Sequence, residues 1–256
     1  MIITFMSGAE SFSWIGLANE KPGLMANQNR GPCESTSLSF IQRRLCKMNS
    51  HFEPALNAAA KHTMKICSES MVDSSTAGNM VTPTNEKWSS CFEDMKKLPY
   101  MNQKLKKPTA ESAYLHGLSS GQLITAVYKL CQSGSINDPD SDALCDINHV
   151  SNFVTEFTSI MSFVKRKKSV AEIEIHNARI GQKLAWKTQK NLCKCHGTSG
   201  SCTAKTCFET APLAEHLGQL AFQKYSKSIG IQMPRNGLPK EISSIFAKED
   251  FLFVKN

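Results

Sequence analysis

Four cysteines lie within fifteen residues of this chain, and that spacing restricts the local fold more than any other feature of the sequence. The segment from Cys193 to Cys207 reads CKCHGTSGSCTAKTC. Gly197 and Gly200 can adopt the positive φ angles that tight turns require, and β-branched threonines flank them. The segment therefore predicts a β-hairpin with its tip around these two glycines.

Disulfide bonds are the simplest use of the four sulfur atoms. In an extended arm, residues two apart face the same side, so Cys193 and Cys195 can both face a returning strand. Four cysteines allow three pairings. A Cys195–Cys202 bridge inside a Cys193–Cys207 bridge needs the least rearrangement, and the unequal arms then imply a β-bulge. We expect these nested bridges to hold the tip rigid.

A zinc site is an alternative use of the same residues. Cys193, Cys195, His196, Cys202 and Cys207 offer enough soft ligands for tetrahedral coordination. Structural zinc sites separate paired ligands by about two to four residues. Here one cysteine is adjacent to the histidine, and only Lys194 separates the first two cysteines. The spacing disfavours zinc, and we expect no metal ion.

A serine hydrolase is a further alternative, because Gly197-Thr-Ser199 matches the first part of a nucleophile elbow. Ser201 stands where the second glycine of that motif belongs, and a strand-to-helix turn does not fit between such closely spaced cysteines. We therefore expect no enzyme activity. A purely structural staple, without a function at its tip, stays open.

Composition bounds the class of protein. With 256 residues and 41% hydrophobic content, the chain can bury one sizeable core. Ten cysteines are many for a reducing cytosol, so they indicate an oxidising compartment. A formal net charge of +8 would attract polyanions such as nucleic acid, heparan sulfate or an anionic membrane. No apolar run reaches the roughly 18 to 20 residues of a membrane-spanning helix.

The first residues carry no recognisable export signal. The stretch from Met1 to Met6 has no basic residue and is shorter than the roughly 7 to 15 apolar residues of a signal-peptide core. Because the cysteines indicate secretion, we expect a signal peptide to lie upstream of Met1.

Hydrophobic periodicity predicts a helical bundle of about four or five helices up to about residue 191. Thr109-Ala-Glu-Ser is a fair N-terminal capping pattern for one helix, which Gly117 and Gly121 would weaken. Polar, glycine- and proline-rich stretches predict loops. The expected helices are 50–72, 109–131, 149–164 and 169–190, and the expected loops are 73–108 and 132–147.

The hairpin segment, followed by Lys205-Thr-Cys207, resembles the signature of Wnt proteins. The likeness extends upstream through Ile175–Lys183, which resembles the helix that leads into the hairpin in that family. Further segments follow the family's order: Cys33, Arg43–Cys46, Ile66-Cys67, Lys87–Cys91 and Glu111–Cys131.

The resemblance implies a mainly α fold, with a saposin-like N-terminal helical bundle and a disulfide-stapled β-hairpin. It implies a bundle over 1–191, the hairpin over 192–210, and a helix with a truncated linker over 211–256. Glu249–Val254 resembles the lead-in to the family's C-terminal cysteine-rich domain, which we expect to be absent. Phe208 stands where that family usually has tryptophan.

The resemblance also implies how the tip works. In Wnt proteins the serine at the position of Ser199 carries an O-linked palmitoleoyl group, which enters a groove on the cysteine-rich domain of the receptor Frizzled. Lys194, Thr198, Gly200 and Ser201 match positions that contact this receptor around the lipid. No cofactor is implied beyond the covalent acyl group.

The expected partners follow from the same family. They are Frizzled, a lipoprotein-receptor-related co-receptor, and a membrane acyltransferase and the Wntless carrier during secretion. Heparan sulfate is expected at basic clusters such as Lys104–Lys107 and Arg166–Lys168, and nucleic acid is not expected. Two alternatives stay open: a truncated decoy that binds receptor without signalling, and a basic helical protein that binds polyanions.

The family pattern suggests three more disulfides. It pairs Cys67 with Cys91, and less directly Cys33 with Cys46. It also suggests a bridge between Cys131 and Cys145. Two further cysteines that the family has nearby are missing from this chain, so other partners for this last pair stay open.

Overall fold

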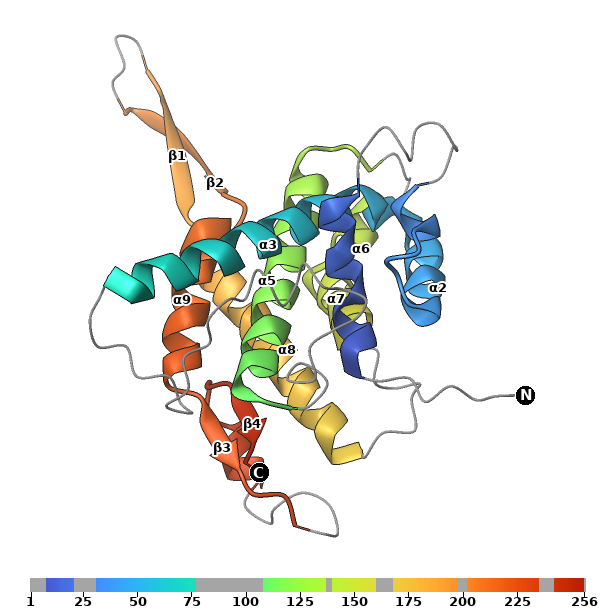
Figure 1. Ribbon diagram of the computed structural model, residues 1–256. Coiled ribbons are helices and arrows are strands. Elements are labelled where there is room, and N and C mark those ends of the chain that lie inside the picture. The colour runs from blue at the N-terminus through green and yellow to red at the C-terminus, as the bar shows by residue number, and fades with distance from the viewer. Residues whose placement is uncertain are drawn as a thin grey trace.

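The computed structural model describes residues 8–20, 31–76, 108–136, 140–159, 168–197, 202–234 and 242–255. Within these ranges it is a bundle of helices from which a two-stranded hairpin projects (Figure 1). The mainly α fold with a disulfide-stapled hairpin, expected from the sequence, is confirmed. No described helix is both long and apolar enough to cross a membrane.

Five helices form the body of the bundle. Their bounds are α3 Glu53–Thr76, α5 Ala110–Gln132, α7 Ile147–Ser159, α8 Lys168–Lys187 and α9 Ala214–Ser226. Four of the five agree closely with the helices expected from periodicity. The shorter helices are α2 Phe40–Met48, α6 Ser141–Leu144, α10 Ile242–Phe246 and the 3-10 helices η1 Gly8–Asn19, η2 Pro32–Glu34 and η3 Ser50–Phe52.

Helix α5 lies at the centre of the bundle, with α3, α7, α8 and α9 around it (Figure 1). Every residue from Ala110 to Val127 is buried. The expected cap is present, because the Thr109 hydroxyl accepts a hydrogen bond from the amide of Ser112 at 3.2 Å. A helix that is buried on all sides is the core around which the others pack.

The glycines of α5 bring it close to its neighbours. A β-carbon at Gly121 would lie 2.7 Å from the carbonyl oxygen of Gly181 on α8, and one at Gly181 would overlap the carbonyl group of Gly117. Glycine lowers helix propensity, but here it allows the backbones of α5 and α8 to touch. The two α5 glycines are thus packing residues rather than weak points of the helix.

Residues after the hairpin belong to the same body. Helix α9 and the β4 region contribute to the main hydrophobic core of the bundle through Leu217, Ala221, Tyr225 and Phe251. Phe251 lies against Gly117, which leaves room for its ring. Because burial of apolar surface is favourable, both elements pack against α5.

Two short parallel strands finish the described chain. Strand β3 (Ile229–Ile231) pairs with β4 (Leu252–Val254) in parallel, so that Ile229 is opposite Leu252. Side chains of both strands pack on Ile173 of α8, forming a small second core. This pair ties the end of the chain to the N-terminal half of α8.

Candidate functional site

The chain forms the β-hairpin that the sequence predicted. Strands β1 (Asn191–His196) and β2 (Ala204–Glu209) are antiparallel, and every residue of β1 is exposed. The strands extend away from the top of the bundle, so that little more than their base approaches the helices (Figure 1). Since β1 buries none of its side chains, the hairpin depends on covalent links rather than on a core.

Two disulfides supply those links. Cys193 is directly opposite Cys207, and their α-carbons are 4.0 Å apart in a disulfide. Cys195 forms the inner bridge to Cys202, with α-carbons 4.7 Å apart. These are the nested pairs expected from the sequence.

The expected β-bulge is absent from the described ladder. The pairing is continuous from Asn191 opposite Glu209 to His196 opposite Ala204. Cys195 therefore faces Lys205 in the ladder, while its disulfide reaches past the end of β2 to Cys202. The unequal spacing of the cysteines is taken up between the strands rather than within them, which corrects that prediction.

The expected receptor-contacting residues divide into two sets. Lys194 lies in β1 opposite Thr206 and is exposed. Because alternate residues of a strand face opposite sides, Lys194 is on the face away from Cys193 and Cys195. The acylation candidate Ser199 and its neighbours Thr198, Gly200 and Ser201 lie outside the described residues, in the sequence between the two strands.

Hydrogen bonds close the base of the hairpin. The Thr210 amide donates to the Lys190 carbonyl at 2.8 Å, and the Lys190 amide donates to the Thr210 hydroxyl at 3.1 Å. Just below this pair, the buried Thr188 hydroxyl donates to the Ala185 carbonyl at 2.8 Å. The same hydroxyl accepts a hydrogen bond from the Leu213 amide, also at 2.8 Å. The chain therefore enters and leaves the hairpin through one tied junction at the end of α8.

Helix α8, which leads into the hairpin, contains a polar motif whose role the sequence analysis missed. The buried Asn177 side chain donates to the Leu252 carbonyl at 2.9 Å and accepts from the Leu252 amide at 2.8 Å. The buried Gln182 amide donates to Ser120 of α5 at 3.1 Å and to Thr155 of α7 at 2.8 Å. Polar residues on the buried face of an amphipathic helix were the available signal.

The residue before Asn177 also contacts the β4 region. His176 donates from Nε2 to the Asp250 carbonyl at 3.0 Å, and its ring stacks on Phe246 with centroids 5.0 Å apart. Burial lowers the pKa of His176 below its usual value, with Lys183 and Arg179 adding to the effect. The imidazole is therefore neutral near pH 7.

Ion pairs anchor the same segment to the end of α8. Glu249 pairs with Lys187 at 2.7 Å and with Lys183 at 3.5 Å. Asp250 pairs with Lys224 of α9 at 2.9 Å. The segment that leads into β4 is thus attached to the helix that carries the hairpin.

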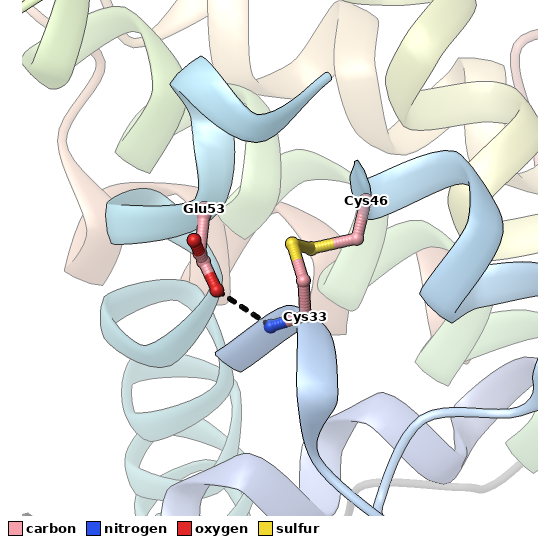
Figure 2. Close-up of side chains that lie close together, drawn as sticks. All are labelled: Cys33, Cys46 and Glu53. Carbon is pink, nitrogen blue, oxygen red and sulfur yellow. Dashed lines mark hydrogen bonds between the residues drawn. A yellow bond between two sulfur atoms is a disulfide. The ribbon is translucent and has the colours of Figure 1, made fainter. Parts of the chain in front are cut away.

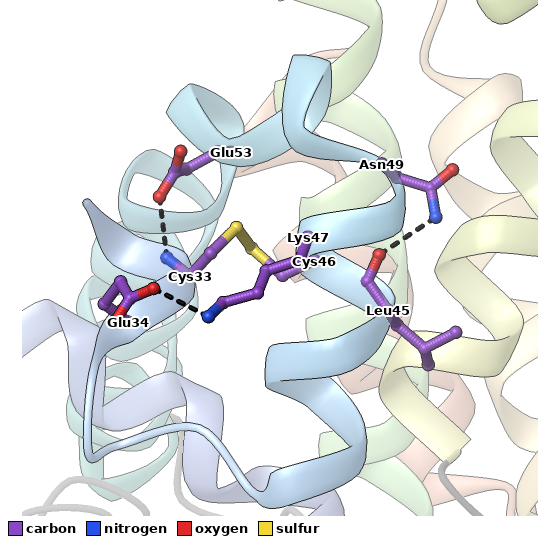
Figure 3. The surroundings of a disulfide bond; sticks show 7 residues. All are labelled: Cys33, Glu34, Leu45, Cys46, Lys47, Asn49 and Glu53. Atoms are coloured by element: carbon purple, nitrogen blue, oxygen red, sulfur yellow. Dashed lines mark hydrogen bonds and ion pairs between the residues drawn. A yellow bond between two sulfur atoms is a disulfide. The ribbon is translucent and has the colours of Figure 1, made fainter. Parts of the chain in front are cut away.

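The other bridges stabilise the bundle. Cys33–Cys46 ties η2 to α2, with α-carbons 5.4 Å apart, and lies beside an ion pair between Lys47 and Glu34 at 2.6 Å (Figure 3). Cys131 and Cys145 form a disulfide with their α-carbons 5.8 Å apart, as the family pattern suggested. Cys67 is buried and disulfide-bonded, whereas its expected partner, Cys91, lies outside the described residues.

One group in the described chain brings together three residues of types that bind metals. The group consists of Cys33, Cys46 and Glu53, and its two sulfur atoms are joined to each other (Figure 2). The Glu53 carboxylate accepts a hydrogen bond from the Cys33 amide at 2.7 Å. Metal ligation requires a thiolate, so this group is a structural staple, and the same argument applies to the hairpin cysteines.

The fold and the hairpin define a class of helical proteins from which a disulfide-stapled hairpin projects. The chain belongs to the Wnt family, whose sequence profile matches residues 34–254. It is 24% identical to Wnt-9a of Gallus gallus over 246 residues, covering 90% of this chain and 64% of that protein. It is 22% identical to Wnt-16 of Bos taurus over 259 residues, covering 90% and 66%. The chain thus spans just under two thirds of the length of these relatives.

Solved structures share the fold. A chain in the structure of human WLS in complex with WNT8A matches with a TM-score of 0.52 at 21% identity, covering 81% of this chain and 72% of that chain. The crystal structure of the Drosophila WntD N-terminal domain-linker matches with a TM-score of 0.51 at 17% identity, covering 80% and 96%.

Proposed function

We propose that this chain is a secreted, lipid-modified ligand of the Wnt type. It binds the Frizzled cysteine-rich domain through an acyl group on Ser199, with Lys194, Thr198, Gly200 and Ser201 contacting the receptor around the lipid. The observation that carries the proposal is the exposed hairpin, which two disulfides stiffen on both sides of the Ser199 segment. Family membership supports the proposal and disfavours the polyanion-binding alternative.

In this proposal, burial of the lipid supplies most of the free energy of receptor binding. Burying an acyl chain of about sixteen carbons at roughly 0.8 kcal/mol per methylene gives a gross gain on the order of 10 kcal/mol. Immobilising a flexible loop would reduce that gain, because ordering on binding costs free energy. A hairpin already fixed by the Cys193–Cys207 and Cys195–Cys202 bridges has less ordering to undergo.

Partners during secretion follow from the same proposal. A membrane acyltransferase attaches the palmitoleoyl group to Ser199, and a Wntless carrier takes up the acylated protein. The similarity in fold to a chain in the structure of human WLS in complex with WNT8A supports the carrier. A lipoprotein-receptor-related co-receptor completes the proposed assembly. Heparan sulfate binding through Lys104–Lys107 and Arg166–Lys168 stays a prediction, since these clusters lie largely outside the described residues.

Intact-mass measurement tests the acylation. Protein secreted from animal cells is expected to carry one palmitoleoyl group, and peptide mapping is expected to place it on Ser199. Inhibiting the acyltransferase should remove this mass without changing the disulfides. An unmodified Ser199 in protein from untreated cells would contradict the proposal.

A further inference from the structure

The hairpin has few connections that could fix its angle to the bundle. The bonds between Lys190 and Thr210 join the hairpin to itself, and the bond between Thr188 and Leu213 joins the two chain segments just below it. Two adjacent connections of this kind act as a hinge. They hold the strands together, but they leave the hairpin free to tilt.

One side chain from a different part of the bundle reaches the hairpin. Gln132, the last residue of α5, donates from Nε2 to the Glu209 carbonyl of β2 at 2.7 Å. Within the described ranges, this is the hydrogen bond that connects a hairpin strand to a helix other than the one that leads into it. Glu209 is adjacent to Thr210, so this bond joins the end of α5 to the base of the hairpin.

The support for Gln132 is itself rigid. Cys131 is disulfide-bonded to Cys145, in the link between α6 and α7. Just after α5 ends, Gly134 has a φ of +64° and its amide donates to the Cys131 carbonyl at 3.2 Å. The Ser133 hydroxyl donates to the Leu130 carbonyl at 2.7 Å. The end of α5 is therefore held by a cap and a covalent bridge.

We propose that Gln132, supported by the Cys131–Cys145 bridge, is a positioning residue that sets the tilt of the hairpin relative to the bundle. The hairpin would then present its tip at a fixed angle. The consequence for receptor binding rests on the proposed function, whereas the tilt itself does not. Gln132 is exposed, so its hydrogen bond contributes little to folding, and its effect is on orientation.

The chain offers matched variants. Gln132→Glu has nearly the same shape, but its carboxylate cannot donate to the Glu209 carbonyl and is repelled by it. Gln132→Leu removes the donor without adding charge. Gln132→Lys restores a donor on a side chain long enough to reach. Ser133→Ala is the control, because it removes exposed hydrogen bonds of the same turn, to Leu130 and Ser135, that do not reach the hairpin.

The experiment measures orientation directly. Nitroxide side chains, attached through genetically encoded amino acids at the exposed positions Lys61 of α3 and Lys205 of β2, give a distance distribution by pulsed electron resonance in the full secreted chain. We expect one narrow distribution for the parent, Ser133→Ala and Gln132→Lys, and a broadened or shifted one for Gln132→Glu and Gln132→Leu. Unfolding midpoints should agree among all five proteins.

A second measurement separates the two proposals. If the hairpin binds receptor, Gln132→Glu should weaken binding to the Frizzled cysteine-rich domain by about 3- to 10-fold, and Gln132→Lys should restore it. A parent that does not bind at all would contradict the proposed function and leave the distance result intact. A distribution for Gln132→Glu and Gln132→Leu as narrow as that of the parent, and at the same distance, would overturn the positioning role.

Discussion

Gly181 of α8 lies directly against the backbone carbonyl of Gly117 on α5, so closely that a β-carbon at Gly181 would overlap it. This contact sets the separation of the central helix from the helix that carries the hairpin. It involves backbone on both sides, so neither partner can move aside by changing a rotamer.

Gly181→Ala should therefore destabilise the whole bundle. Overpacking at a rigid contact costs about 1 to 3 kcal/mol, and we expect the upper part of that range. Chemical unfolding of the secreted protein measures the loss. Arg179→Ala, at an exposed position of α8, is the control and should change stability by less than about 0.5 kcal/mol. Equal stability of the two variants would show that the helices separate more easily than the structure implies.

Asn177→Ala should release the end of the chain from α8. The substitution leaves both the amide and the carbonyl of buried Leu252 without their Asn177 partner, at a cost of about 2 to 4 kcal/mol for the two groups. Hydrogen exchange of the Leu252 amide should accelerate. Lys224→Ala, which removes a partly exposed ion pair with Asp250, should cost less than about 1 kcal/mol. Unchanged exchange at Leu252 in Asn177→Ala would count against this role.

Stability should fall in mild acid because of His176. Burial lowers its folded-state pKa below the unfolded value of 6.5, so the unfolded chain binds the proton more readily. The stability that neutral His176 provides is present above about pH 6.5 and is lost as the pH falls toward the folded pKa. Unfolding between pH 7.5 and 5 measures the slope.

His176→Gln is the matched variant for this slope, since its amide can still donate to the Asp250 carbonyl. The slope between pH 7.5 and 5 should be shallower than in the parent. His62, whose pKa is also lowered by burial, contributes its own part and should keep it. An identical slope in parent and variant would remove His176 from the account.

Loss of the inner bridge should loosen the hairpin without unfolding the bundle. The double variant Cys195→Ser with Cys202→Ser removes a disulfide between residues seven apart in sequence. Losing the loop-closure entropy of this bridge should lower the local stability of the hairpin by about 2 to 3 kcal/mol. Amide exchange in β1 and β2 should rise, while the bundle unfolds at the same midpoint, because β1 is exposed and contributes nothing to the core. A lower bundle midpoint would show that the hairpin and the bundle are coupled.

Four of the five main helices could be predicted from the sequence because their apolar residues recur at helical spacing. Helix α2 was not predicted, although Ser39 and Gln42 form a capping box that marks its start. The 3-10 helix η1 buries Phe12, Trp14, Ile15 and Leu17, which do not follow an α-helical period. Its structure depends on packing against α3, and sequence periodicity carries no signal for that.

In the candidate site too, features set by local sequence could be predicted, and contacts between distant residues could not. The nested hairpin bridges followed from cysteine spacing, since a short segment limits which sulfur atoms can meet. Gln132 and Asn177 could not be assigned, because their partners at Glu209 and Leu252 are distant in sequence. Gly117 and Gly121 lower the helix propensity of α5, and the contact with Gly181 of α8 that explains them carries no signal in the sequence.

One paired binding assay tests most directly whether an acyl group on Ser199 carries receptor binding, as we propose. Purified Ser199→Ala, Ser201→Ala and parent protein are compared for affinity to the Frizzled cysteine-rich domain, with equal unfolding midpoints as the criterion of folding. We expect Ser199→Ala to bind at least about 100-fold more weakly, because the proposed lipid would supply most of the apolar surface buried on binding, and Ser201→Ala to lose far less. Folded Ser199→Ala that binds as tightly as the acylated parent would contradict the account.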